Sequence, residues 1–211
     1  LEYQEEGLQT EAWSLLFHDL PQLGQAIRYL DLLQLVKKTL PIGTTFQAIP
    51  ELLAALGKNN VRTAVMAGPK CREQSNKVVA LHLDCLFETV LYTDFFTRSA
   101  TGALAGAFAD LRERWKDLGP KEIAYIADDP RVDFPAARRA GFHTVRLRLH
   151  RTSHEYDEPR APEEKPELEF TSVHGLVAAL CRHFAIDPGR VLPGEWDYYL
   201  KPRPWRFLGW K

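Results

Sequence analysis

The fold expected for this chain is decided by one stretch, Glu122-Ile-Ala-Tyr-Ile-Ala-Asp-Asp-Pro-Arg-Val-Asp133. It begins with an apolar run that favours a β-strand, and the run stops at an acidic turn that contains Asp128, Asp129 and Asp133. Three carboxylates are therefore expected at the carboxyl end of one strand. Open α/β sheets bind their ligands at that edge, so a divalent cation or a phosphate group is expected there.

Strands and helices alternate through the middle of the chain. Apolar runs that end at glycine, proline or acidic residues predict strands, and segments with helical spacing predict helices. This alternation is typical of a parallel sheet covered by helices, so we expect an α/β fold. The predicted strands are residues 61–66, 87–92, 123–127, 143–147 and 168–170, and the predicted helices are residues 50–56, 73–81, 103–118, 136–140 and 172–184.

Three parts of the chain differ in composition. Residues 1–40 have apolar residues at helical spacing and predict a helical, cap-like segment. Residues 41–186 predict the α/β core, within which the polar segment 150–167 is expected to be an exposed loop. Residues 187–211 form a proline- and tryptophan-rich tail, expected either to dock on another protein or larger assembly or to pack on its own domain. Its aromatic residues include Trp196, Tyr198, Tyr199, Trp205, Phe207 and Trp210.

The bulk properties narrow the class of protein. The chain has 211 residues, 45% of them hydrophobic and 26% charged, with a net charge of −1, so a general affinity for nucleic acid is not expected. No apolar run is long enough to span a membrane, and no signal-peptide pattern opens the sequence. The three cysteines, Cys71, Cys85 and Cys181, lack metal-type spacing and favour a reducing compartment, either the cytoplasm or an organelle matrix or stroma.

Several segments resemble the haloacid dehalogenase (HAD) superfamily of phosphatases and related hydrolases. Residues 50–56 resemble the helix that enters the second motif strand, and residues 77–87 resemble a later helix and turn. The run Ala127-Asp-Asp-Pro-Arg-Val-Asp133 is similar to the fourth motif. The resemblance covers residues 41–180 and implies a Rossmannoid parallel sheet covered by helices.

The resemblance also shows where catalytic residues are missing. A first motif, a strand ending in Asp-x-Asp, is not found, so the central strand of the sheet is expected to be missing as well. Met66 stands where the second motif has Ser or Thr, and Gly102 stands at the position of the third-motif Lys. A thioether cannot donate a hydrogen bond to a phosphoryl oxygen. Lys70 and Arg98 are the cations that could bind phosphate in an active enzyme.

Two functions from different classes follow. The first is a HAD-like pseudoenzyme that acts as a structural or interaction subunit, with no cofactor expected. The second is a Mg²⁺-dependent phosphomonoester hydrolase whose nucleophilic aspartate lies upstream of Leu1, with Asp128, Asp129 and Asp133 as metal ligands. The structural interpretation of these aspartates is helix capping.

Two weaker hypotheses stay open beside them. A receiver-like signalling domain is the third function, because acidic pairs after a strand also occur there. Metal binding by His150 and His154, with the acidic residues between them, is a minor alternative for the polar segment.

Overall fold

The computed structural model describes residues 45–46, 48–68, 71–97, 102–150, 152 and 154–191. The helical segment expected before residue 41 lies outside these residues. So do Lys70, Arg98 and the aromatic residues of the tail. Within the described part of the chain, no helix has the length and apolar character needed to cross a membrane.

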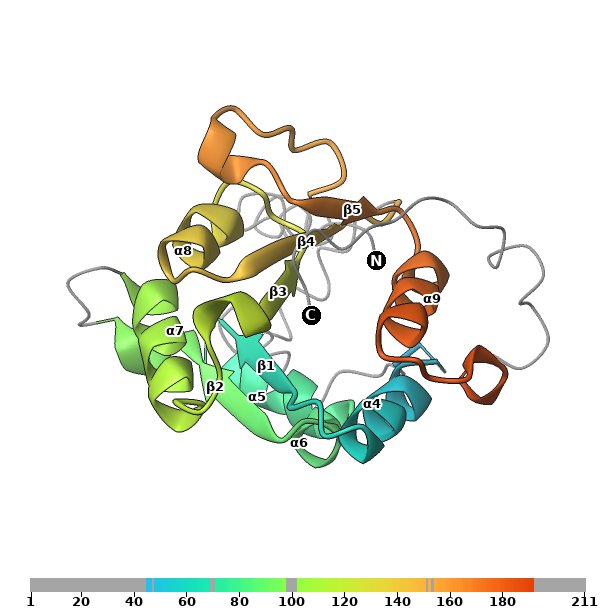
Figure 1. The fold of residues 1–211 in the computed structure, drawn as a ribbon. Helices are drawn as coiled ribbons and strands as arrows, with labels where there is room; N and C mark the ends of the chain where they lie inside the picture. Colours follow the sequence, from blue (N-terminus) through green and yellow to red (C-terminus); the bar gives the residue numbers. More distant parts are fainter. Residues whose placement is uncertain are drawn as a thin grey trace, which may run out of the picture. The chain divides into compact units, whose positions relative to one another are not determined.

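The elements alternate between strand and helix, and every strand pairing is parallel (Figure 1). This confirms the α/β prediction. The strands are β1 (Ala64–Ala67), β2 (Thr89–Tyr92), β3 (Ala124–Ala127), β4 (His143–Leu147) and β5 (Leu168–Phe170). The α-helices are α4 (Ala48–Lys58), α5 (Cys71–Ala80), α6 (Leu83–Leu86), α7 (Ala103–Arg114), α8 (Asp133–Arg139) and α9 (Val173–His183). Short 3₁₀ turns are η1 (Thr93–Phe96), η2 (Pro120–Glu122), η3 (Pro162–Glu164) and η4 (Pro188–Arg190).

The strands form two separate sheets in the described part of the chain. One contains β1 and β2, with Met66 opposite Leu91, and the other has the order β3-β4-β5. Strands β1 and β3 therefore each keep an edge that no described strand pairs with.

A hydrophobic cluster joins the two sheets. It contains Leu91 from β2, Phe108 from α7 and Phe142 just before β4, and Tyr125 of β3 packs against it. The Phe108 side chain is 1% exposed, and its ring meets those of Tyr125 and Phe142 edge-on, at centroid distances of 4.9 and 5.1 Å. Such edge-to-face pairs add to the stabilisation from burial alone.

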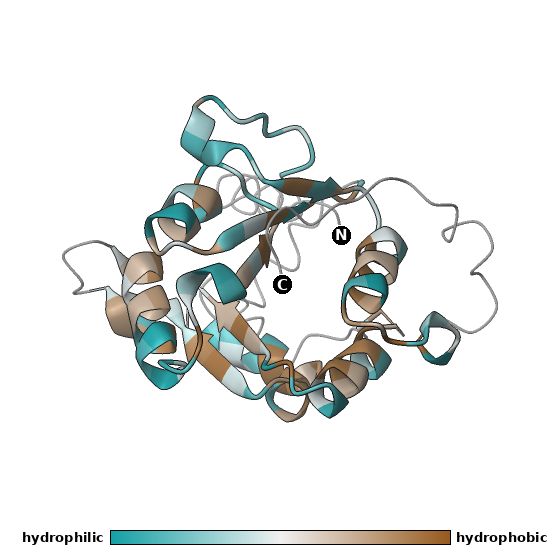
Figure 2. Cartoon of the chain, in the orientation of Figure 1, coloured by the Kyte–Doolittle hydropathy of each residue, from teal (hydrophilic) through white to brown (hydrophobic). Residues whose placement is uncertain are grey.

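A second cluster packs α4 against α9. Leu52 of α4 and Val177 of α9 are buried in it together with Val191, so the packed core extends beyond residue 186. Figure 2 shows apolar residues on both helices, whereas the segment between β4 and β5 is mainly hydrophilic. Ser172 caps α9, because its hydroxyl accepts a hydrogen bond from the Gly175 backbone N–H at 3.1 Å.

Several predicted boundaries were wrong. Helix α8 begins at Asp133 rather than residue 136, since Pro135 is compatible with the first turn of a helix. Helix α7 ends at Arg114 rather than at residue 118, because the backbone of Trp115 is no longer helical. The short helix α6 was not predicted; it follows His82, whose left-handed φ of 55° separates it from α5.

Candidate functional site

The acidic turn joins the end of β3 to the start of α8. One carboxylate oxygen of Asp129, Oδ1, accepts hydrogen bonds from the backbone N–H groups of Arg131 at 2.9 Å and Val132 at 3.3 Å. The carbonyl of Asp129 accepts a further bond from the Asp133 N–H at 3.2 Å. Asp129 therefore holds the turn in shape before α8 begins. The N-cap of α8 itself is Val132, and no side chain caps the helix.

Asp133 is engaged with a tyrosine of β3. The Tyr125 hydroxyl donates a hydrogen bond to Asp133 Oδ1 at 3.0 Å, in a partly buried setting. Burial raises the pKa of Asp133 to about 6, and the charges of Asp129 and Asp128 add to this, while the bond from Tyr125 opposes it. Burial also raises the pKa of Tyr125, so its hydroxyl remains a donor at neutral pH.

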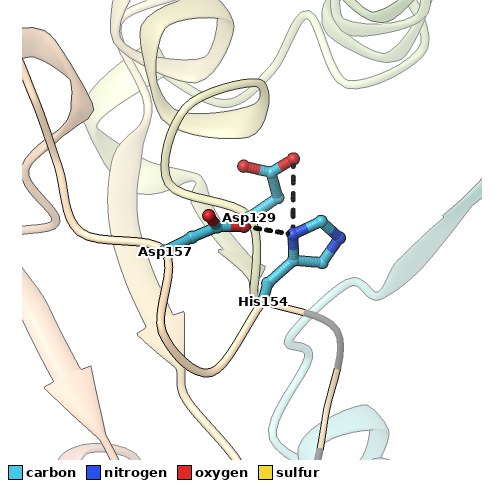
Figure 3. A group of neighbouring side chains, drawn as sticks. All are labelled: Asp129, His154 and Asp157. Atoms are coloured by element: carbon cyan, nitrogen blue, oxygen red, sulfur yellow. Dashed lines mark hydrogen bonds and ion pairs between the residues drawn. The ribbon is translucent and has the colours of Figure 1, made fainter. Parts of the chain in front are cut away.

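The second carboxylate oxygen of Asp129 faces a histidine from the segment after β4 (Figure 3). His154 Nδ1 lies 3.8 Å from Asp129 Oδ2 and 2.8 Å from Asp157 Oδ2. Burial lowers the pKa of His154, but the hydrogen bond with Asp157 and the charge of Asp129 outweigh it, so the net pKa is raised. The hydrogen bond with His154 lowers the pKa of Asp157.

A buried arginine of β4 holds these segments together. The guanidinium of Arg146 is fully buried and donates to the backbone carbonyls of His154 and Asp157, both at 2.8 Å, and to that of Asp128 at 3.2 Å. Its Nη1 also lies 3.4 Å from Glu169 of β5. Because a buried guanidinium is costly without partners, these bonds pin the loop to the end of the acidic turn.

The prediction that residues 150–167 form an exposed loop was therefore wrong in part. His154 and Asp157 are only 33% and 27% exposed, although Tyr156 between them is 80% exposed. The loop is partly buried because the Arg146 side chain requires hydrogen-bond acceptors, and the backbone carbonyls of the loop provide them. A second arginine, Arg131 of the acidic turn, pairs with Asp157 Oδ1 at 2.8 Å.

The residues singled out by sequence fall into different environments. Of the three aspartates, Asp129 joins the His154 group, while Asp133 faces Tyr125. Met66 packs against the cluster around Phe108. Gly102 is the residue before α7, with a φ of 96° and a ψ of 160°.

Sequence reasoning missed Arg146 and Asp157 and gave His154 little weight. Arg146 lies in a short strand and Arg148 follows two residues later, and this pattern is typical of a solvent-exposed face. The alternation of Thr144 and Arg146, both 0% exposed, is the pattern that could have indicated a buried polar face.

Among the described residues, the group whose ligand atoms all lie within 4.8 Å of one another is Asp129, His154 and Asp157. It offers two carboxylate oxygens and an imidazole nitrogen. Mg²⁺ is held by oxygen ligands in octahedral geometry, whereas Zn²⁺ accepts a mixture of imidazole and carboxylate. The group therefore suits a transition metal better than Mg²⁺.

Comparison with known proteins identifies the architecture. No family model matches the sequence, and no curated protein is significantly similar to it. Among solved structures, a dehalogenase with an intermediate complex aligns with a TM-score of 0.50 at 16% identity, over 66% of this chain and 56% of that one. The L-2-haloacid dehalogenase RSc1362 aligns with a TM-score of 0.50 at 18% identity, over 65% and 56%. This chain has a HAD-like fold.

A further solved structure aligns with a lower TM-score. An L-2-haloacid dehalogenase from Xanthobacter autotrophicus gives a TM-score of 0.46 at 16% identity, over 63% of this chain and 59% of that one. The HAD-like chain spans 56% of the first two dehalogenases. At these identities the similarity shows the fold alone.

Proposed function

We propose that this chain is a HAD-like pseudoenzyme that serves as a structural or interaction subunit. The aromatic tail beyond residue 191 would be its docking segment. The observation that carries the proposal is the engagement of the acidic turn with the protein itself. Asp129 holds its own turn through Oδ1, and Asp133 accepts a hydrogen bond from Tyr125.

The setting of Met66 supports this function. The residue lies in β1 at the position where the family's second motif has a hydroxyl, and its side chain packs with the hydrophobic cluster instead. A thioether at this point contributes to the core and offers no donor to a phosphoryl group.

The backbone of Gly102 supports it as well. Its φ of 96° and ψ of 160° lie in a region that is essentially restricted to glycine. A lysine at this position, where the third motif would supply one, would be strained by about 1–3 kcal/mol. The local backbone is thus built for glycine rather than for a charge-neutralising side chain.

Losses of this kind reduce catalysis steeply. Each preorganised donor to a developing negative charge is worth about 3 kcal/mol in comparable sites, so two absent donors compound to a very low rate. A chain with both substitutions is therefore better suited to a structural role.

The experiment is a phosphatase assay on the full-length protein with p-nitrophenyl phosphate and millimolar Mg²⁺. We expect the wild type to show no more turnover than Asp128→Asn. This variant is chosen because Asp128 is the acidic residue nearest the end of β3. Glu163→Gln, which removes an exposed carboxylate of η3, is the matched control. Turnover that Asp128→Asn abolishes and Glu163→Gln preserves would refute the proposal.

The alternative is a Mg²⁺-dependent phosphomonoester hydrolase whose nucleophilic aspartate precedes Leu1. The observation that favours it is the unpaired edge of β1 and of β3 in the described part of the chain, since an additional strand could pair there. The phosphatase assay, carried out on the product of the complete gene, distinguishes the two functions.

A further inference from the structure

We propose that Asp129, His154 and Asp157 form a binding site for Zn²⁺ or another divalent transition metal, which clamps the loop after β4 to the acidic turn. The three side chains come from two segments that are far apart in sequence, and Figure 3 shows them turned toward one another. The site shares only Asp129 with the acidic residues assigned to phosphatase chemistry, and its argument does not depend on the pseudoenzyme proposal.

The two distances from the imidazole nitrogen to the carboxylate oxygens are close to those in a metal site, and all three donor atoms lie within 4.8 Å of one another. Zn–N and Zn–O bonds of about 2.0–2.2 Å at tetrahedral angles place neighbouring donor atoms about 3.4 Å apart. The distances from His154 Nδ1 to Asp157 Oδ2 and Asp129 Oδ2 are 2.8 and 3.8 Å, one below and one above that value. Side-chain shifts of about half an ångström would bring both to the expected spacing.

In each of the two carboxylates, the two oxygen atoms have different partners. Asp129 uses Oδ1 for the backbone of its turn, and Asp157 uses Oδ1 for Arg131 at 2.8 Å. Both Oδ2 atoms remain directed at the same nitrogen of His154. Metal ligands are commonly oriented by outer partners in this way, so that the free donor atoms converge without a large entropic cost.

The backbone beneath the ligands is fixed by a group that is not itself a ligand. Arg146 bonds the carbonyls of two of the ligand residues, His154 and Asp157, as well as the carbonyl next to the third, that of Asp128. The cationic groups of Arg146 and Arg131 face carbonyls and Oδ1, rather than the Oδ2 atoms that converge on His154.

Three protein ligands leave one tetrahedral position for water. The imidazole must offer its Nδ1 lone pair to the metal, so the neutral imidazole would carry its proton on Nε2, and an imidazolium would release one proton to solvent as the metal binds. The site would then hold two carboxylates and a neutral imidazole around a dication, with no net charge from the ligands and metal together.

The test is isothermal titration calorimetry of the full-length, chelator-treated protein with Zn²⁺ alone, repeated on two matched histidine variants. His150→Gln is the control, because His150 lies in the same loop, is 73% exposed and pairs with Glu155. We expect the wild type and His150→Gln to bind Zn²⁺ with micromolar or tighter affinity. His154→Gln should weaken this binding about 100-fold or more.

Asp129→Asn provides a second variant that keeps the fold. Its amide oxygen can still accept the backbone bonds that Asp129 Oδ1 accepts, so the turn survives while the ligand charge is lost. It should also weaken Zn²⁺ binding, and circular dichroism without metal should show the same folded state for all variants. Absence of Zn²⁺ binding by the wild type, or equal affinities of the two histidine variants, would overturn the proposal. In a separate titration with Co²⁺ in place of Zn²⁺, a thiolate charge-transfer band would also overturn the proposal, since the ligands would then be cysteines.

Discussion

Replacing Asp133 by asparagine should stabilise the protein at neutral pH. In the folded state burial raises the pKa of Asp133 to about 6, from an ordinary value of 3.8. The folded state therefore binds this proton more tightly than the unfolded state does, and the fold loses stability as the pH rises from the unfolded-state pKa to the folded-state pKa. Asparagine has no charge to bury, and its carbonyl oxygen can still accept the hydrogen bond from Tyr125.

The size and sign of the effect follow from proton linkage. A shift of about 2 pH units corresponds to about 3 kcal/mol, and the residual solvent contact of Asp133 reduces the expected gain to about 1–2 kcal/mol. Well below the unfolded-state pKa, near about pH 3, both states of the wild type are protonated, so variant and wild type should be equally stable. As the pH rises from about 4 to about 6 the wild type loses stability and the variant does not, and the difference is constant above about pH 7.

The assay is urea unfolding followed by circular dichroism at several pH values between about 3 and 8, with Asp133→Asn compared against the wild type. Glu163→Gln, which removes an exposed carboxylate, should follow the wild type at every pH. A destabilised Asp133→Asn at about pH 7.5, or the full gain already present at about pH 3, would refute the reasoning. The first result would mean that the charge of Asp133 has a partner that the fold needs.

Two further predictions concern packing. Arg146→Gln should lower the free energy of unfolding by about 3 kcal/mol in urea titrations, because it removes donors from three loop and turn carbonyls; a loss below 1 kcal/mol would mean that the loop is held by other contacts. Phe108→Ala should cost about 3–5 kcal/mol in the same titration, because the 1% exposed ring fills the cluster between the two sheets. Phe95→Ala, at 73% exposure, should change it by less than about 0.5 kcal/mol, and equal effects of the two phenylalanine substitutions would contradict the assigned core.

The sequence predicted the strands and the order of the elements because their determinants are local. Strands of a parallel sheet, such as β3 and β4, are apolar runs bounded by glycine, proline or aspartate. Such runs can be recognised in the sequence without knowing where the strand lies in the sheet. Helix ends were predicted less well, because an end depends on a few backbone hydrogen bonds rather than on a long pattern. The early start of α8 is an example, since Asp129 turns the chain before the apolar spacing begins.

The contacts around Arg146 could not be predicted in the same way. Its burial depends on a loop that returns to the sheet at His154 and Asp157, and no local pattern specifies that return. An arginine in a strand is expected at the surface unless acceptors surround it. Here the acceptors are backbone carbonyls, which are present in every sequence and so leave no compositional trace.

The acidic turn shows why a motif can identify a fold without identifying an activity. Asp129 is needed by the turn itself, because its Oδ1 accepts hydrogen bonds from the N–H groups of Arg131 and Val132, which precede α8. This need persists whether or not a substrate is ever bound. The remaining oxygen of the same carboxylate is free to take another role, and here it faces His154 rather than a neighbouring aspartate. A carboxylate that stabilises its own turn through one oxygen can thus take part in a different site through the other. In this HAD-like fold, the acidic turn faces a histidine from a distant loop in this way.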